Sequence, residues 1–321
     1  MKLRVAVVGV GSLGQHHARV LASMPDVDLA GVVDIRADRA AEIAARHGCP
    51  AFTSAAGLTD LDAVVVAVPT EAHASVAGPF LERRVSVLLE KPLTASLAEA
   101  DALIELAERR GAILAAGHIE RFNPAVAVAL PLVSNPRFVE VHRLGSFPDR
   151  SLGIDVVFDL MIHDLDVLLA AVGPDVASIE AVGVQVLTPR IDIANARLGF
   201  SSGCIANVTA SRISRDRVRK VRFFQHDSYV SIDYAAQEAE AYRLTSGNGR
   251  PVIEGGRLDV PRDEPLQREL ADFVDAVRTR RDPLVTGRAG RDALALASRI
   301  AHAMAAPASG VLPRHTGGRS R

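Results

Sequence analysis

The stretch VFDLMIHDLD, residues 157–166, places carboxylates and an imidazole in an otherwise apolar helical pattern. At about 100° per residue, Asp155, Asp159, His163 and Asp166 fall on one stripe of a helix. The apolar residues form a separate stripe that would anchor the helix, namely Phe158, Met161, Ile162, Leu165, Leu168 and Leu169. Such a helix turns acid–base groups toward a partner, which is the arrangement that proton transfer requires.

Two other interpretations of this stripe stay open. Asp and His side chains also form interior ion pairs for structural reasons. A metal site is a weaker alternative, because no HExxH or comparable ligand set accompanies these residues. We therefore predict no metal.

Composition limits the possible functions. The 321 residues are 48% hydrophobic, which favours about two globular domains. The net charge is −1, with acidic and basic residues intermingled, so a nucleic acid or an anionic membrane is not an expected partner. Cys49 and Cys204 are far apart and have no zinc-ligand spacing, which fits a reducing compartment. The apolar run of MKLRVAVVGVG is too short for a secretory signal, so we predict a cytoplasmic protein without a membrane span.

The N-terminal third alternates short apolar runs with helical patterns. This alternation predicts a doubly wound parallel sheet. Ser96 and Glu99 have capping-box spacing at the start of the last of these helices. The expected strands are 3–9, 29–34, 63–69, 85–90 and 112–118, and the expected helices are 13–24, 37–47, 71–83 and 96–110.

The first strand-to-helix turn reads GVGSLG, with Gly9, Gly11 and Gly14. In this context the first glycine permits a tight turn, the second leaves room for a pyrophosphate, and the third lets helix and strand pack closely. Ser12 and Leu13 lie at the helix N-terminus, where phosphates bind. We therefore predict a dinucleotide-binding site.

Asp34 ends the second strand, twenty residues after Gly14. Its carboxylate can accept hydrogen bonds from the adenosine ribose and would repel a 2′-phosphate, which favours NAD over NADP. Arg36 keeps NADP open as the alternative, since a guanidinium could pair with that phosphate. Ile35 and Arg36 are included in the expected cofactor contacts.

Two further strand ends carry polar residues at the edge where open α/β sheets bind ligands. The strand at 63–69 runs into Pro69, Thr70 and, at the next helix start, His73. The strand at 85–90 runs into Glu90 and Lys91. We expect cofactor contacts from these residues, although a helix-start contact is as good an interpretation of His73.

The order and spacing of several motifs resemble the Gfo/Idh/MocA oxidoreductases. These motifs are the glycine turn with Asp34, VPTEAH, EKP, GHIERFNP (117–124), the Asp159/His163 pair and EPLQRELADFVDAV (264–277). The resemblance covers residues 3 to about 303. It implies an N-terminal Rossmann domain followed by an α/β domain with a large, mostly antiparallel sheet. The pattern of the second half agrees, with expected strands at 137–145, 176–187, 191–200, 203–212, 218–225 and 228–233.

The resemblance also implies catalytic roles. Lys91 and the pair Asp159/His163 would meet the substrate hydroxyl beside the nicotinamide. His163 would act as general base, with Asp159 orienting or biasing its imidazole, and Lys91 would stabilise developing alkoxide charge. Asp166 would bind a neighbouring hydroxyl.

Within this family, GHIERFNPAV, VHRLGSF (141–147) and DLMIHDLDVL are similar to the nucleotide-sugar branch. Its members oxidise the 3-hydroxyl of UDP-N-acetylglucosamine to a ketone, which a PLP-dependent aminotransferase converts to a 3-amino sugar for lipid A or related glycans. Arg121 and Arg143 are candidates to bind the diphosphate, because guanidinium offers bidentate donors, although for either one alone a surface position or an ion pair is the favoured interpretation. Asn123 is a further candidate substrate contact.

Two other functions stay open. One is a dehydrogenase of free polyols, inositols or sugars in the same family. The other is a non-catalytic, NAD-binding regulator on the same fold, against which the presence of both Lys91 and His163 counts. We place the dinucleotide-binding domain at 1–118, the substrate-binding and oligomerisation domain at 119–305, with a last helix at 288–305, and a poorly ordered tail at 306–321. The resemblance implies a homodimer or homotetramer, in which one face of the large sheet would be covered by a second copy instead of by its own helices.

Overall fold

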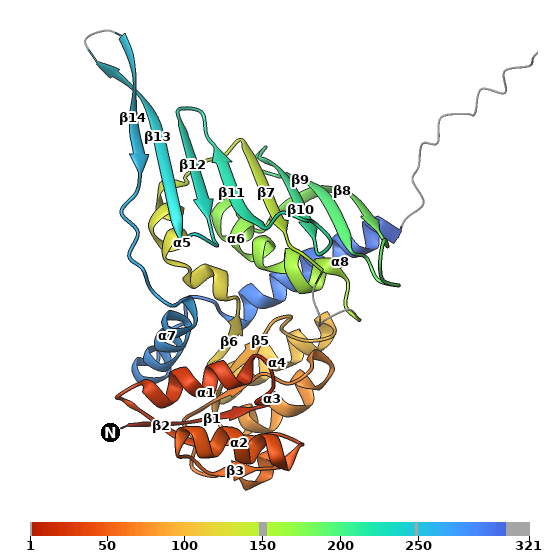
Figure 1. Ribbon diagram of the computed structural model, residues 1–321, viewed down its shortest axis with the longest axis vertical. Helices are drawn as coiled ribbons and strands as arrows, with labels where there is room; N and C mark the ends of the chain where they lie inside the picture. Colours follow the sequence, from red (N-terminus) through yellow and green to blue (C-terminus); the bar gives the residue numbers. More distant parts are fainter. Residues whose placement is uncertain (1, 148–152, 248–249, 306–321) are drawn as a thin grey trace, which may run out of the picture.

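The computed structural model describes residues 2–147, 153–247 and 250–305, in two domains (Figure 1). The lower domain contains a parallel six-stranded sheet, sheet A, with strand order β3-β2-β1-β4-β5-β6. This order confirms the predicted doubly wound fold. Its strands are β1 (Leu3–Val8), β2 (Val27–Val33), β3 (Ala51–Phe52), β4 (Ala63–Val66), β5 (Ser86–Glu90) and β6 (Leu114–Gly117).

Helices cover both faces of sheet A, which is why its central strands read as continuous apolar runs. The predicted capping box at α4 is confirmed: the Ser96 side chain accepts from the Glu99 N–H, and the Glu99 side chain accepts from the Ser96 N–H. The helices are α1 (Gly14–Ser23), α2 (Ala37–His47), α3 (His73–Glu82) and α4 (Leu97–Arg110), with 3₁₀ turns η1 (Ala55–Gly57) and η2 (Thr70–Ala72).

The upper domain contains the eight-stranded sheet B, with order β14-β13-β12-β11-β7-β10-β9-β8. Only the β7–β10 pair is parallel, so the predicted mostly antiparallel sheet is confirmed. Its strands are β7 (Phe138–Leu144), β8 (Val176–Val184), β9 (Ile193–Phe200), β10 (Ile205–Ser211), β11 (Val218–Phe224), β12 (Ser228–Asp233), β13 (Glu238–Gly247) and β14 (Arg250–Arg257).

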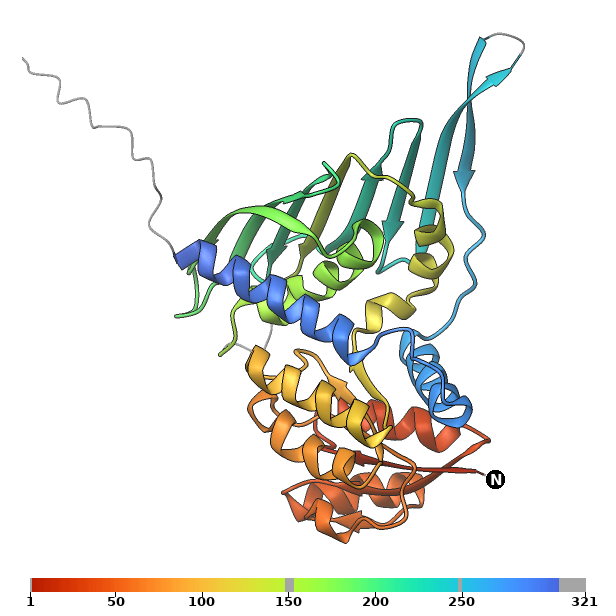
Figure 2. The same ribbon diagram turned by 180° about the vertical axis from the view of Figure 1, so that it is seen from behind.

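One face of sheet B is covered by helices, whose apolar residues share a core with alternate residues of the strands (Figure 2). The helix that carries His163 is central to this layer. The covering elements are η3 (Ile119–Phe122), α5 (Pro124–Ala129), η4 (Leu130–Leu132), the π-helical turn η5 (Val157–Met161), α6 (Ile162–Val172) and α8 (Gly287–Ala305).

The β13–β14 hairpin and the short strand β3 were not among the predicted strands. The side chains of β14 are exposed along almost its whole length, so no inward–outward alternation marks it, and Pro251, Gly255 and Gly256 are typical of loops. The two residues of β3 are too few for a pattern.

Part of the range assigned to the second domain lies against sheet A. Helix α7 (Pro265–Thr279) contributes Leu266, Leu270, Phe273 and Val274 to the apolar core of the N-terminal domain, beside α1. The boundary after residue 118 therefore separates the sheets, but the chain returns to sheet A before α8. The predicted tail at 306–321 lies outside the described residues. No helix in the described ranges has the length and hydropathy needed to cross a membrane.

Candidate active site

The glycine turn after β1 has the geometry of a dinucleotide cradle. Gly9 has φ +86°, and a Cβ there would lie 2.6 Å from the carbonyl oxygen of Ala67. A Cβ on Gly14 would lie 1.7 Å from the carbonyl oxygen of Gly9. Packing therefore requires glycine at both positions. A Cβ on Gly11 would meet no protein atom within 4 Å, so this side of the turn is open for a pyrophosphate.

Asp34 lies directly across from this turn. Its Oδ2 accepts from the Val10 N–H at 3.1 Å, and its Oδ1 accepts from the Arg36 N–H at 3.0 Å. The Arg36 guanidinium is mostly exposed, 3.8 Å from Asp34. Arg39, which sequence reasoning missed, donates to the carbonyl oxygen of Val10 at 2.8 Å and to Gln15 at 2.9 Å, so it fastens α2 to the glycine turn. These residues fit the adenosine side of NAD.

We expect the wild type to bind NADH more tightly than NADPH, and Asp34→Ala to narrow that difference. The carboxylate repels a 2′-phosphate, and the substitution removes this repulsion. Because Asp34 also holds two backbone N–H groups, Asp34→Asn is the control that keeps the shape and removes the charge. Calorimetric titration of both nucleotides measures the effect. Equal affinities of the wild type for NADH and NADPH would contradict the role of Asp34 and point to Arg36.

The ends of β4 and β5 bring the next predicted residues to the same edge of sheet A. Pro69 is exposed and Thr70 half-buried at the start of η2. His73 is buried, and its ring nitrogens lie 3.0–3.1 Å from backbone carbonyl oxygens of residues 68, 92 and 93. The structure thus supports the helix-start interpretation of His73, which joins the two strand ends instead of facing a cofactor.

Glu90 is held by a histidine that sequence reasoning missed. His17 Nε2 on α1 lies 2.7 Å from Glu90 Oε1, and His17 is buried. Burial raises the pKa of Glu90, but the hydrogen bond from His17 and the charge of Lys91 outweigh it and lower the pKa below its ordinary value. Glu90 is therefore ionised at the end of β5, where its Oε2 also accepts from the Lys91 N–H at 3.2 Å.

Lys91 reaches across to the C-terminal domain. Its Nζ donates to the backbone oxygen of Asp159 at 2.6 Å and lies 3.3 Å from Asp159 Oδ1. The prediction from sequence was that Asp159 would orient His163, whereas the structure pairs its carboxylate with Lys91. The physical reason is local geometry: Asp159 lies in the π-helical turn η5, so residues 157–163 do not follow the regular α-helical stripe.

His163 is the second residue of α6 and is half-buried. Its Nδ1 is buried, and no described residue hydrogen-bonds to it. The ring of His118 stands edge-on to it, with centroids 6.1 Å apart. Sequence reasoning missed His118, although it directly follows β6, the same strand-end position that singled out Lys91.

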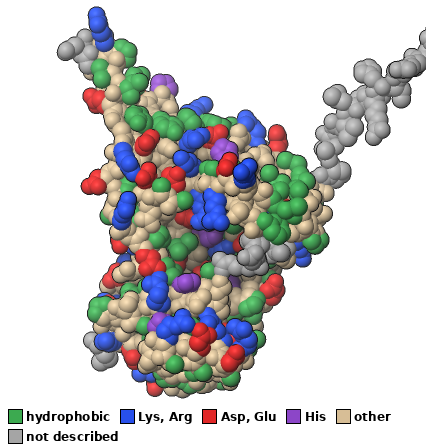
Figure 3. Space-filling view, viewed as in Figure 1, with side chains coloured by type: hydrophobic (Ala, Val, Ile, Leu, Met, Phe, Trp, Pro, Cys, Tyr) green, Lys and Arg blue, Asp and Glu red, His purple; other side chains and the backbone are tan. Residues whose placement is uncertain are grey.

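The environment of His163 keeps its imidazole neutral. Burial lowers its pKa well below the ordinary value, and the charges of Lys91 and Arg143 lower it further. Figure 3 shows a hollow between the two domains, with histidine side chains in it and basic side chains on the side of the C-terminal domain.

We expect the acidic limb of the pH profile of kcat/KM to lie below pH 6.5. The neutral imidazole is the form that accepts a proton, and a lowered pKa keeps it neutral as the pH falls through the ordinary histidine value of about 6.5. Activity is then lost only when the pH falls through the lowered pKa. Initial rates at low substrate concentration test this, and a limb at or above pH 6.5 would contradict it.

The predicted diphosphate ligand Arg143 has another role in the structure. It is 4% exposed; Nε and Nη2 donate to the Asp164 carboxylate at 2.5 and 3.0 Å, and Nη1 donates to Glu120 at 3.0 Å. Its donors are thus used inside the protein, to join β7, α6 and η3. Removing one partner of such a buried group typically costs about 3–5 kcal/mol.

The other predicted substrate contacts differ in accessibility. Arg121 is half-buried, with Nη1 3.5 Å from Asp166 Oδ1. Asp166 is 2% exposed, and no described residue hydrogen-bonds to its Oδ2. Asn123 is buried and caps α5 by accepting from the Ala125 N–H at 3.1 Å, so the structure gives it a structural contact.

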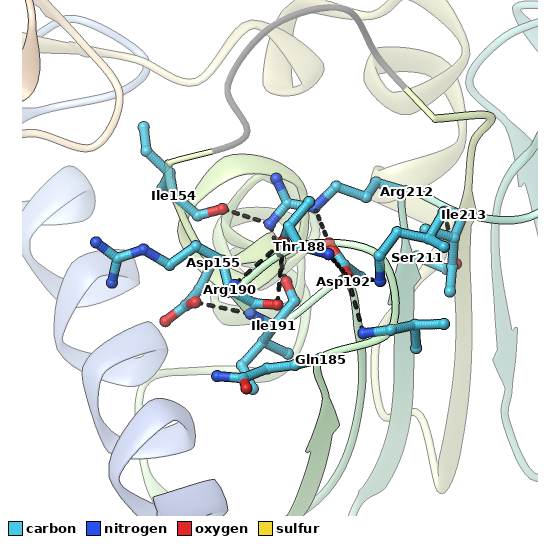
Figure 4. A network of polar contacts seen from close by, with 12 residues as sticks. Ile154, Asp155, Gln185, Thr188, Arg190, Ile191, Asp192, Ser211, Arg212 and Ile213 are labelled. Atoms are coloured by element: carbon cyan, nitrogen blue, oxygen red, sulfur yellow. Dashed lines mark hydrogen bonds and ion pairs between the residues drawn. The ribbon is translucent and has the colours of Figure 1, made fainter.

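A buried polar network fixes the start of η5 (Figure 4). Arg212 donates to the backbone oxygens of Ile154 and Ile191, and its Nε lies 3.3 Å from Asp192 Oδ1. Asp192 also accepts three backbone N–H groups of the preceding loop. Asp155, expected on the polar stripe, instead accepts from the Ile191 N–H at 2.9 Å. The network therefore determines where the turn carrying Asp159 begins.

No group of three or more His, Cys, Asp or Glu side chains in the described part of the chain has a metal-binding arrangement. The chemistry of this region lies in Lys91, the neutral imidazole of His163 with the ring of His118 beside it, and the carboxylates around them. This set of groups can transfer a proton to the imidazole, close to the dinucleotide cradle and with the positive charge of Lys91 nearby.

Comparison with known proteins agrees with this arrangement. Residues 3–118 match the family described as "Oxidoreductase family, NAD-binding Rossmann fold", and residues 133–226 match the GFO/IDH/MocA C-terminal domain. The chain is 40% identical over 302 residues to a UDP-N-acetylglucosamine 3-dehydrogenase of Acidithiobacillus ferrooxidans, covering 93% of this chain and 96% of the relative. A solved structure of that dehydrogenase superposes with a TM-score of 0.88 at 39% identity, covering 94% of this chain and 98% of the other.

More distant relatives share the architecture. A scyllo-inositol 2-dehydrogenase (NAD(+)) of Bacillus subtilis is 27% identical over 322 residues, covering 89% of each chain. A levoglucosan dehydrogenase solved with NADH and levoglucosan has the same fold, with a TM-score of 0.85 at 18% identity over 95% of this chain and 98% of the other. The chain belongs to the GFO/IDH/MocA oxidoreductase family, as its motifs predicted. It is an NAD-dependent dehydrogenase that acts on a CH–OH group.

Proposed function

We propose that the chain oxidises the 3-hydroxyl of UDP-N-acetylglucosamine to a ketone. The observation that carries this proposal is the meeting of Lys91, from the NAD-binding domain, with Asp159 one turn before His163. The 40% identity to a UDP-N-acetylglucosamine 3-dehydrogenase, over nearly the whole of both chains, supports this substrate.

The cofactor would be held by the carboxyl edge of sheet A. Backbone groups at the glycine turn would bind the pyrophosphate, and Asp34 would bind the ribose. NAD, when bound, supplies the acceptor for the hydride that leaves the substrate carbon. The other proposed cofactor contacts are Ser12, Leu13, Ile35, Arg36, Pro69, Thr70, Glu90 and Lys91.

His163 would accept the hydroxyl proton of the substrate, because burial and nearby cations keep its imidazole neutral. Lys91 would place its ammonium where alkoxide character develops. Asp159 holds that ammonium through its backbone oxygen and its carboxylate. Asp166 on α6 and its ion-pair partner Arg121 on η3 remain candidates to bind a neighbouring hydroxyl.

Turnover with matched ligands tests the proposal. NADH absorbance at 340 nm is followed with UDP-N-acetylglucosamine or with myo-inositol, with a carbonyl reagent present to remove the ketone, because oxidation of a secondary alcohol by NAD is generally uphill at neutral pH. We expect NADH to form with UDP-N-acetylglucosamine and not with myo-inositol. Turnover of myo-inositol alone would favour a polyol dehydrogenase, for which the inositol dehydrogenase relatives are the supporting observation. Binding of UDP without any turnover would favour a non-catalytic sensor.

The wider context is also proposed. A 3-keto sugar is the substrate that a PLP-dependent aminotransferase requires for a 3-amino sugar, as in lipid A assembly. The free cysteines Cys49 and Cys204 support a reducing, cytoplasmic location. The sheet B face without covering helices supports a homodimer or homotetramer.

A further inference from the structure

Arg219 on β11 is the basic residue near His163 that the sequence-based search for a diphosphate ligand did not identify. The side chains of Val221 and Phe223 on the same strand enter the core beneath α6. Because side chains alternate along a strand, Arg219 points from the same face. It is exposed, so a ligand can reach it.

The register places Arg219 directly opposite Arg143 on β7. Arg143 is neutralised by Asp164 and Glu120, as described above. In the described ranges no carboxylate pairs with Arg219, whereas the neighbouring Lys220 and Arg222 pair with Asp233 and Glu140. Arg219 therefore carries a positive charge that no carboxylate in the described ranges neutralises, and its direct neighbour across the strand pair is another arginine.

The charge of Arg219 acts on two residues of α6. After burial and the charges of Lys91, Arg143 and His118, the charge of Arg219 also lowers the pKa of His163. The same charge acts on the neighbouring Asp164. The basic side chains on the C-terminal side of the hollow are visible in Figure 3.

We propose that Arg219 binds the diphosphate of the nucleotide sugar, in place of the buried Arg143. This inference rests on the proposed function. A guanidinium offers two parallel N–H donors that match phosphate oxygens. The diphosphate would supply the negative charge that Arg219 lacks, and would do so on the side of His163 away from the NAD-binding domain.

The test is calorimetry on the NADH complex with UDP and with uridine, using wild type, Arg219→Met, Arg219→Lys and Arg222→Met. Arg222→Met is the matched control, since it removes the same charge from the same strand on the opposite face. We expect Arg219→Met to weaken UDP binding about 10- to 100-fold and leave uridine unchanged. Arg219→Lys should recover part of the affinity, and Arg222→Met should bind UDP as the wild type does.

Other outcomes separate the two proposals. A wild type that oxidises UDP-N-acetylglucosamine while Arg219→Met binds UDP normally overturns the role of Arg219 and leaves the proposed function standing. If Arg219→Met and Arg222→Met weaken UDP binding equally, the proposal is also overturned. The effect would then come from the overall electrostatic potential of the protein and not from a direct contact. Loss of NADH binding in Arg219→Met also overturns the proposal, because the substitution would then act by disturbing the fold and not by removing a contact with the diphosphate. A wild type that neither binds UDP nor oxidises the nucleotide sugar overturns the proposed function, and this inference with it.

Discussion

Replacing His163 by Ala is expected to lower kcat with UDP-N-acetylglucosamine about 10²- to 10⁴-fold, because the variant has no group to accept the hydroxyl proton. NADH binding should change little, since the cradle for the nucleotide is built from the ends of β1 and β2. Because His163 Nδ1 makes no hydrogen bond to a described residue, the substitution breaks no such bond there. Stopped-time assays with the ketone trapped measure the rate, and calorimetry measures the nucleotide affinity.

His142→Ala is the matched control for this experiment. His142 precedes Arg143 on β7 and is half-buried on the opposite face of sheet B, so its loss should leave kcat unchanged. A His163→Ala variant with wild-type kcat would remove His163 from the mechanism. The general base would then have to be sought in the second imidazole, that of His118, whose two ring nitrogens are buried without a partner among the described residues.

Replacing Lys91 by Met is expected to lower kcat about 10²- to 10³-fold, the usual effect of removing one preorganised donor to a developing oxyanion. The substitution also removes a positive charge beside His163, so the pKa of His163 should rise and the acidic limb of the pH profile should move upward. This displacement distinguishes an electrostatic role from a purely structural one. Asp159 is only partly buried, so the loss of its partner should destabilise the fold little.

Lys91→Arg is the companion variant. It keeps the positive charge, so the acidic limb should stay where it is in the wild type, while a guanidinium changes the geometry of the donor and lowers kcat. An unchanged pH profile in Lys91→Met, together with normal kcat, would show that Lys91 is neither the electrostatic partner of His163 nor a donor to the substrate.

Local signals in the sequence determined most of the N-terminal domain. Each signal acts within a few residues: the glycines of the first turn are required by close packing, and the capping box at Ser96 joins residues three apart. Continuous apolar runs predicted strands covered on both faces, because a strand buried on both faces needs apolar side chains at successive positions. The strand-end position of Lys91 and the helix position of His163 likewise singled them out as candidate functional residues, whereas their catalytic roles came from the family resemblance.

Only the tertiary structure decided which of these groups meet. Lys91 pairs with Asp159, 68 residues away, and Arg143 with Asp164. No periodicity encodes such pairs, because the first depends on how the two domains meet and the second on how α6 packs on sheet B. Packing within the C-terminal domain buries the predicted arginine, Arg143, among carboxylates and leaves Arg219, which was not predicted, exposed on the neighbouring strand. The type of a side chain fixes its charge. Whether that charge is paired inside the protein or is available to a ligand depends on neighbours that are distant in the chain.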